Sequence, residues 1–158
     1  MCMKFKIAEP KDAWLIHELM IQAFSEYKNE VPPSSALDET VDSIIDAMEN
    51  GEKSLIAFSE NIPVAMVRFQ LKEDGLYFYR LSVIPEKQGK GIAKKLLQSL
   101  EEIAKKEGLT TIYCKVRLNV PRNIYLYQSL GYEITNEEIV HKPNGIDLRV
   151  VTMIKSLI

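Results

Sequence analysis

Two glycines and four lysines lie close together in residues 87–95, between an apolar run and an amphipathic one. Gly89 and Gly91 lack a Cβ, so an anion can approach their backbone closely. Where a strand turns into a helix, the first helical N–H groups have no partner within the helix, and the helix dipole attracts negative charge. These features together indicate a site for a phosphate group. The lysines, with no carboxylate among them, are Lys87, Lys90, Lys94 and Lys95.

The glycine spacing alone also suits an ordinary connection between a strand and a helix. Two well-known phosphate-binding motifs are absent. A P-loop requires Lys and then Ser or Thr after its second glycine, but Ile92 follows Gly91. A dinucleotide-binding fingerprint requires a third small residue where this chain has Lys94. The pattern therefore predicts anion binding by a different kind of turn.

A strand before this turn and a helix after it must position the glycines. Residues 76–84 carry large side chains on both faces, which predicts a central strand covered on both sides. Residues 89–108 have the strongest amphipathic helix pattern in the chain, and residues 110–118 alternate as another strand. Strand, helix and strand predict a parallel crossover unit. On the first strand, Tyr77, Tyr79, Leu81 and Val83 are expected on one face, and Phe78, Arg80 and Ser82 on the other.

The rest of the chain predicts an α/β, or α+β, fold: a mixed, mostly antiparallel central sheet with helices on both faces. A second helix is expected to begin at an N-cap of Asp38 or Thr40 and to end at Asn50-Gly51. All elements are expected in a single domain of residues 1–158. The remaining expected strands are residues 4–8, 54–59, 62–71, 132–140 and 146–155, and the remaining helices are residues 10–27 and 121–130.

Composition excludes several classes of protein. The chain has 158 residues, 46% of them apolar and 27% charged, as in an ordinary globular protein. A net charge of −2 argues against a basic nucleic-acid-binding protein. No apolar run approaches the roughly 20 residues of a membrane span, and the N-terminus lacks the apolar segment of a signal peptide. Cys2 and Cys114, without nearby histidines, predict neither a disulfide framework nor a metal site, and suit a reducing, cytoplasmic setting.

Three groups of residues occur in a recognisable order. They are Leu81-Ser82-Val83 with Pro85 and Gln88-Gly89-Lys90-Gly91-Ile92-Ala93; then Asn119; then Ile124, Leu126-Tyr127 and Leu130-Gly131-Tyr132. Together they resemble the GNAT superfamily of acetyl-CoA-dependent N-acetyltransferases. Gln88, Gly91 and Ala93 match its Gln/Arg-x-x-Gly-x-Gly/Ala signature. The similarity in element order covers essentially the whole chain, but it is weak before residue 71.

The resemblance implies a donor site for acetyl-CoA. Backbone groups of the strand end would hold the pantetheine arm in a cleft where strands 76–84 and 110–118 splay apart. The N–H groups of the turn would bind the pyrophosphate, and Tyr127 would be the general acid that protonates the departing CoA thiolate. The resemblance assigns acetyl-CoA binding to Leu81, Ser82, Val83, Gln88, Gly89, Lys90, Gly91, Ile92 and Ala93, with an asparagine, Asn119 or Asn123.

Several assignments stay open at this point. The family often has an asparagine three residues before an alanine, where this chain has Val120 and Asn123, so Asn119 and Asn123 compete for the CoA contact. Tyr127 also lies on an apolar stripe with Ile124 and Leu130, which gives it an alternative role in packing. The general base is not identified; Glu26, Glu30, Glu73 and an ordered water are the candidates.

The leading hypothesis is an N-acetyltransferase that moves the acetyl group to a primary amine of a small molecule or peptide by direct attack in a ternary complex. The alternatives are a non-catalytic acyl-CoA-binding sensor and a nucleotide-binding domain unrelated to acyl transfer. The expected partners are acetyl-CoA and an amine, with no nucleic acid and no membrane, and a homodimer is left open.

The acceptor is expected to approach across residues 27–37 and 141–146. Acidic residues there either favour a cationic acceptor or form a solvated surface; they are Glu26, Glu30, Asp38 and Glu39.

Overall fold

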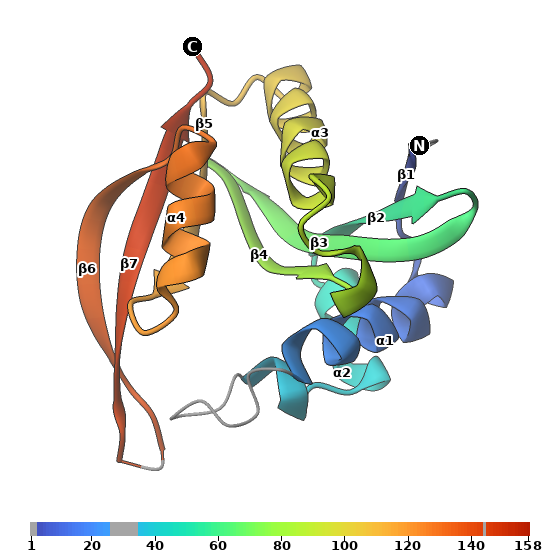
Figure 1. The fold of residues 1–158 in the computed structure, drawn as a ribbon, viewed down its shortest axis with the longest axis horizontal. Coiled ribbons are helices and arrows are strands. Elements are labelled where there is room, and N and C mark those ends of the chain that lie inside the picture. The colour runs from blue at the N-terminus through green and yellow to red at the C-terminus, as the bar shows by residue number, and fades with distance from the viewer. Residues whose placement is uncertain (1–2, 26–34, 144) are drawn as a thin grey trace. The chain divides into compact units, whose positions relative to one another are not determined.

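A computed structural model describes residues 3–25, 35–143 and 145–158, and its elements follow the predicted order (Figure 1). The strands are β1 Met3–Ile7, β2 Lys53–Ser59, β3 Ile62–Lys72, β4 Gly75–Val83, β5 Thr111–Arg117, β6 Glu133–His141 and β7 Asp147–Ser156. The α-helices are α1 Ala13–Phe24, α2 Val41–Glu49, α3 Ile92–Lys106 and α4 Pro121–Ser129. Short 3-10 turns are η1 Pro10–Asp12, η3 Ser35–Asp38 and η4 Pro85–Lys87.

The strands form a seven-stranded mixed sheet in the order β1-β2-β3-β4-β5-β7-β6. The pairs β1–β2, β2–β3, β5–β7 and β6–β7 are antiparallel. β4 and β5 are parallel, with Leu76 opposite Ile112 and Tyr77 opposite Tyr113. The predicted fold class and the central place of β4 are therefore confirmed. The position of β7 between β5 and β6 was not predicted.

Contacts divide the chain into two compact units. Unit 1 is Met1–Gln70 with Phe78–Leu100, and unit 2 is Leu71–Tyr77 with Glu101–Ile158. β4 and α3 each contribute residues to both units. The single domain expected over residues 1–158 stays a prediction.

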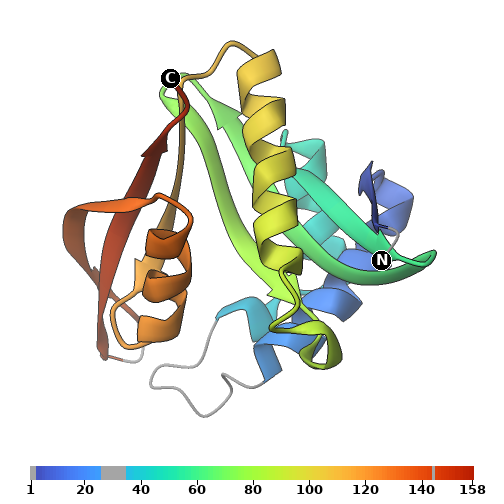
Figure 2. The same ribbon diagram turned by 45° about the horizontal axis from the view of Figure 1, so that its top comes forward.

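In unit 1, helices cover both faces of the strands. α1 and α2 lie on one side of β2 and β3, and the beginning of α3 lies on the other side (Figures 1 and 2). One core cluster joins Ile16 and Met20 of α1 and Ile44 of α2 to Ile56 of β2 and Met66 of β3. Residues 64–69 of β3 are buried without interruption, as a strand covered on both sides requires. Arg68 is the charged residue within this run.

In unit 2, α4 packs on β5. The side chains of Ile112, Cys114 and Val116 are buried along β5, and Ile124 and Tyr127 of α4 are buried as well. β6 is the edge strand, and most of its residues are exposed. Within the ranges that the structure describes, no helix combines the length and the apolar character that crossing a membrane requires.

Candidate functional site

The end of β4, the glycine turn and the start of α3 form one continuous segment of unit 1. α3 begins at Ile92, three residues after the predicted start. The N–H group of Lys95 donates to the carbonyl of Gly91 at 3.2 Å, so the N–H groups of residues 92–94 precede the intrahelical hydrogen bonds. Gly89 and Gly91 have φ angles of 76° and 79°, which side-chain-bearing residues rarely adopt. The turn that the sequence predicted is present.

The space over the two glycines is open. A Cβ built on Gly89 or Gly91 would meet no other atom within 4 Å, and residues 88–91 are exposed. The backbone conformation therefore accounts for the glycines, and crowding within the protein does not. N–H groups that precede the first intrahelical hydrogen bond of a 15-residue helix, beside open space and the exposed Lys90, Lys94 and Lys95, have the chemistry that a phosphate group needs.

The strand end has its own hydrogen bonds. Leu81 and Val83 are half-buried, whereas Ser82 is fully buried and its hydroxyl donates to the carbonyl of Arg80 at 2.9 Å. The side-chain amide of Gln88 donates to the carbonyl of Val83 at 3.1 Å. The Ser82 hydroxyl therefore stabilises the strand through its hydrogen bond to Arg80. The backbone of Ser82 is then the part of the residue to which the predicted contact with the pantetheine arm falls.

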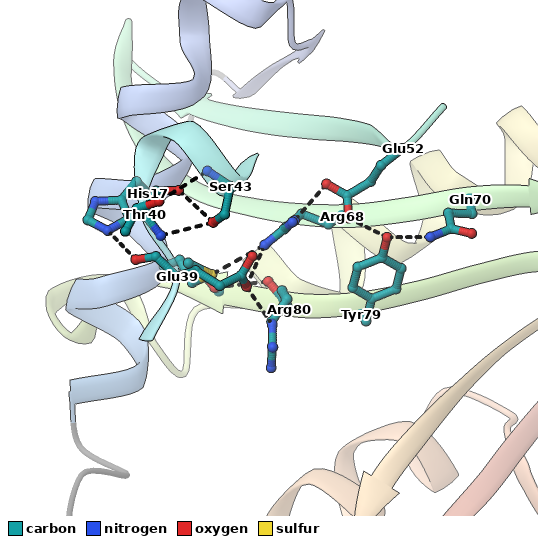
Figure 3. Close-up of polar contacts among 11 residues, drawn as sticks. His17, Glu39, Thr40, Ser43, Glu52, Arg68, Gln70, Tyr79 and Arg80 are labelled. Carbon is teal, nitrogen blue, oxygen red and sulfur yellow. Dashed lines mark hydrogen bonds and ion pairs between the residues drawn. The ribbon is translucent and has the colours of Figure 1, made fainter. Parts of the chain in front are cut away.

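Arg80 interrupts the regular alternation expected for β4. Its φ of 56° lies in the left-handed region, which costs roughly 1–3 kcal/mol for a residue other than glycine. The hydroxyl of Tyr79 donates to Glu52, and Arg80 Nε donates to Glu39, while Arg68 contacts both of these carboxylates (Figure 3). In a regular strand, consecutive side chains point to opposite faces. The predicted placement of Tyr79 and Arg80 on opposite faces is wrong here, because the left-handed residue re-aims the Arg80 side chain.

An ion-pair network follows from this arrangement, buried at Arg68 and Glu52 and partly exposed at Glu39 and Arg80. Arg68 Nη1 lies 2.7 Å from Glu39 Oε2, and Arg68 Nε lies 2.9 Å from Glu52 Oε2. Arg80 Nε lies 3.1 Å from the same Glu39 oxygen. Burial alone would lower the pKa of Arg68, but its hydrogen bonds to Glu39 and Glu52 outweigh that effect and raise the pKa. The guanidinium therefore stays charged, with a carboxylate on each side of it.

Sequence analysis missed this network, which has one sequence signal. Arg68 is the only charged residue of the 62–71 strand, and a buried arginine requires carboxylate partners. That signal predicts a buried ion pair but does not say which glutamates complete it.

Unit 2 holds the other predicted site residues. Tyr127 is 7% exposed, and its ring lies 5.9 Å from that of Tyr132 at an angle of 60°. Asn119 is exposed just before α4, and Asn123 is partly exposed in the first turn of α4. Cys114 is buried, which raises the pKa of its thiol and keeps the thiol protonated. Packing therefore accounts for Cys114 without a nucleophilic role, as expected.

The candidate bases and the expected acceptor region are only partly described. Glu26, Glu30 and residues 27–34 of the expected acceptor loop lie outside the described residues. Glu73 is exposed in the turn before β4, whereas Leu81 and Val83 lie at the other end of that strand. Among the described residues, no group of three or more His, Cys, Asp or Glu side chains could hold a metal ion.

A family comparison identifies this combination of turn and fold. The sequence model of the acetyltransferase (GNAT) family matches residues 15–132. The chain belongs to the GNAT family. The matched range includes both glycines of the turn, Arg80, and the Asn119–Tyr132 segment, so the resemblance seen in the sequence is confirmed.

Individual relatives agree with this assignment. Human N-acetyltransferase 8B is 32% identical to this GNAT protein over 88 residues, which are 55% of this chain but only 39% of that protein. The ribosomal-protein-S18-alanine N-acetyltransferase of Escherichia coli has a TM-score of 0.78 at 17% identity, covering 99% of this chain and 94% of its own. YncA of Salmonella typhimurium, solved with its cofactor acetyl-CoA, has a TM-score of 0.77 at 20% identity, covering 100% of this chain and 95% of its own. At these identities the solved structures establish a shared fold.

Proposed function

We propose that this GNAT protein transfers the acetyl group of acetyl-CoA to a primary amine of a small molecule or peptide. The observation that carries the proposal is the turn after β4, where left-handed glycines, open space and the first N–H groups of α3 lie together. Such a turn is suited to the pyrophosphate of a CoA donor. YncA, which has the same fold, was solved with acetyl-CoA, and this supports the same donor here.

In this proposal, the turn and the strand end bind the donor. The backbone N–H groups from Gln88 to Ala93 bind the pyrophosphate, and the backbone of Leu81, Ser82 and Val83 holds the pantetheine arm. Gln88 also fixes the carbonyl of Val83 through its side-chain amide. Asn119 or Asn123 adds a polar contact to the arm. These roles rest on the family motif, with which the described geometry of residues 81–93 is compatible.

The reaction requires no covalent enzyme intermediate. The neutral amine attacks the thioester carbonyl carbon, and the resulting oxyanion accepts a hydrogen bond from a backbone N–H group such as that of Val83. The carbon–sulfur bond then breaks, and Tyr127 donates its hydroxyl proton to the departing thiolate. The attacking amine loses one proton to a base or an ordered water, and a proton from solvent returns to the Tyr127 oxygen, so that the charges balance and Tyr127 is again protonated. The acetylated amine and free CoA are the products.

The proposal is tested by mixing the protein with acetyl-CoA and a panel of polyamines, aminoglycosides, amino acids and peptides, and measuring the release of free thiol. We expect thiol release that depends on both the amine and the protein. Tight binding of acetyl-CoA without turnover on any amine would favour the acyl-CoA sensor instead. Thermal stabilisation by ATP or NAD, but not by acetyl-CoA, would favour a nucleotide-binding domain.

A further inference from the structure

We propose that Glu39 is a positioning residue, which acts through Arg80 to fix the end of β4 that binds the donor. Its consequence for catalysis rests on the acetyl-CoA site proposed above. All of the residues involved lie in unit 1, and the charged residues of the network lie outside the GNAT motif. Arg80 is a left-handed residue within a strand, a partly buried set of charges holds its side chain, and two helices hold Glu39.

Arg80 is held at both its side chain and its backbone. Its Nε donates to Glu39 at 3.1 Å, and its carbonyl accepts a hydrogen bond from the buried Ser82 hydroxyl at 2.9 Å. Beyond this point, the N–H group of Ile84 donates to the carbonyl of Val64 at 3.0 Å. The Leu81–Val83 backbone therefore runs between two fixed points. The first fixed point, Arg80, has a left-handed backbone conformation that arginine does not prefer.

Glu39 is itself fixed by the helices on either side of it. His17 of α1 contacts the carbonyl of Glu39 through Nε2 at 2.9 Å. The next residue, Thr40, caps α2: its hydroxyl accepts from the N–H group of Ser43 at 3.1 Å, and its own N–H group donates to the Ser43 hydroxyl at 2.9 Å. Figure 3 shows these contacts beside the ion pairs. The carboxylate of Glu39 is therefore presented to β4 from a rigid segment.

Opposite charges surround the buried Arg68 in the described part of this network. Two guanidinium groups, of Arg68 and Arg80, face two carboxylates, of Glu39 and Glu52. Arg68 is 3% exposed, and such a buried pair strongly disfavours the loss of one partner. Tyr79 extends the network by donating to Glu52 and accepting from the side-chain amide of Gln70 at 2.9 Å. Removing the Glu39 charge should therefore weaken the hold on the Arg80 side chain and let the backbone of residues 80–83 relax.

The first test measures the conformation of the ligand-free protein. In Glu39→Gln, amide hydrogen exchange at Ile84 should become faster than in the wild type, whereas exchange at Leu109, which donates to Ala104 at 2.9 Å in unit 2, should change little. An equal change at both amides would mean a general loss of stability and would overturn the proposal. Glu137→Gln is the matched control, since it also removes a carboxylate that pairs with an arginine, Arg149.

The second test measures donor affinity in a double-mutant cycle. Arg80→Gly removes the ion pair while glycine still tolerates the left-handed conformation. Glu39→Gln and Arg80→Gly should each raise the Kd for CoA about tenfold, and the double variant should be no weaker than the weaker single variant. Additive effects, or an unchanged Kd in Glu39→Gln, would contradict the proposal. If the wild-type protein does not bind CoA, the proposed function fails, and the exchange measurement alone then decides the role of Glu39.

Discussion

Tyr127 has two proposed roles, as a general acid and as a packing residue, and these predict different effects of a mutation. A general acid should contribute to kcat, whereas a packing residue should contribute to stability. If Tyr127 protonates the thiolate, Tyr127→Phe should lower kcat by about 100-fold and leave the Kd for acetyl-CoA nearly unchanged. Stopped-flow or steady-state thiol release, with calorimetric measurement of CoA binding, separates the two quantities.

Tyr125→Phe provides the matched control for Tyr127→Phe, because Tyr125 lies on the same helix and is 68% exposed. It should leave both quantities unchanged. A Tyr127→Phe protein that unfolds more easily but turns over normally, with the chemical step rate-limiting, would place Tyr127 in the core alone.

Gly91 tests the proposed pyrophosphate site at the scale of one residue. Gly91→Glu places a side chain and a negative charge in the open space over the turn, and it should abolish measurable acetyl-CoA binding. Gly108→Glu is the control for backbone strain, since Gly108 has a similar φ of 77° and also faces open space. Isothermal titration of both variants with acetyl-CoA decides the matter. Retained affinity in Gly91→Glu would exclude this turn as the phosphate site.

At the scale of elements, Gly75 limits how closely the β3–β4 turn can approach β5. Its φ is 146°, and an added Cβ would lie 2.4 Å from the Thr111 hydroxyl oxygen and 2.7 Å from the Thr111 carbonyl oxygen. Gly75→Ala should therefore destabilise the protein by about 2–3 kcal/mol, through crowding together with backbone strain. Urea unfolding measures this free energy.

Gly51→Ala separates the two causes, because Gly51 has a φ of 103° but no atom near the added Cβ. It should cost about 1–2 kcal/mol from strain alone. Equal losses in Gly51→Ala and Gly75→Ala would show that the Thr111 contact relaxes without cost.

Elements with a local signal were predictable from the sequence. Of the two proposed caps for α2, the structure selects Thr40, whose side chain and that of Ser43 bond reciprocally to backbone groups. The glycine turn and the central place of β4 were predicted for the same reason, since turn residues and two-sided burial are visible in the residue pattern. β7 lies between β5 and β6, an order that depends on long-range pairing that local patterns do not encode.

The candidate site also has one part that was predictable from a local pattern and one part that depends on long-range contacts. The part from Leu81 to Ala93 is contiguous in sequence and was found from its motif. The network behind it joins Glu39, Glu52, Arg68 and Arg80, which are spread over 42 positions, from 39 to 80. Its assembly depends on the left-handed Arg80, and arginine has no special preference for that conformation. Only the folded backbone shows that these charges meet.

At the scale of the whole molecule, three tyrosines with raised pKa values predict how stability depends on pH. Burial, followed by the hydrogen bond to Asp74, raises the pKa of Tyr113 to about 12. Burial and the hydrogen bond to Glu52 raise the pKa of Tyr79 as well, and burial and the charge of Glu101 raise that of Tyr132. Each group therefore holds its proton more tightly in the folded protein than in the unfolded chain, where tyrosine has a pKa of about 10.

The sign of the effect follows from this difference. Between about pH 10 and 12 the folded state binds more protons than the unfolded state, so the free energy of unfolding should fall as pH rises. The slope is at most about 1.4 kcal/mol per pH unit for a fully buried group, and smaller for the half-exposed Tyr113. Urea unfolding at pH 8, 10 and 11 should show a nearly constant value up to pH 10 and a decline above it. Tyr132→Phe should lessen that decline, because Tyr132 is 2% exposed and phenylalanine has no proton to lose. A free energy of unfolding that stays constant to pH 11 would mean that these hydroxyls ionise as readily in the folded protein as in the unfolded chain.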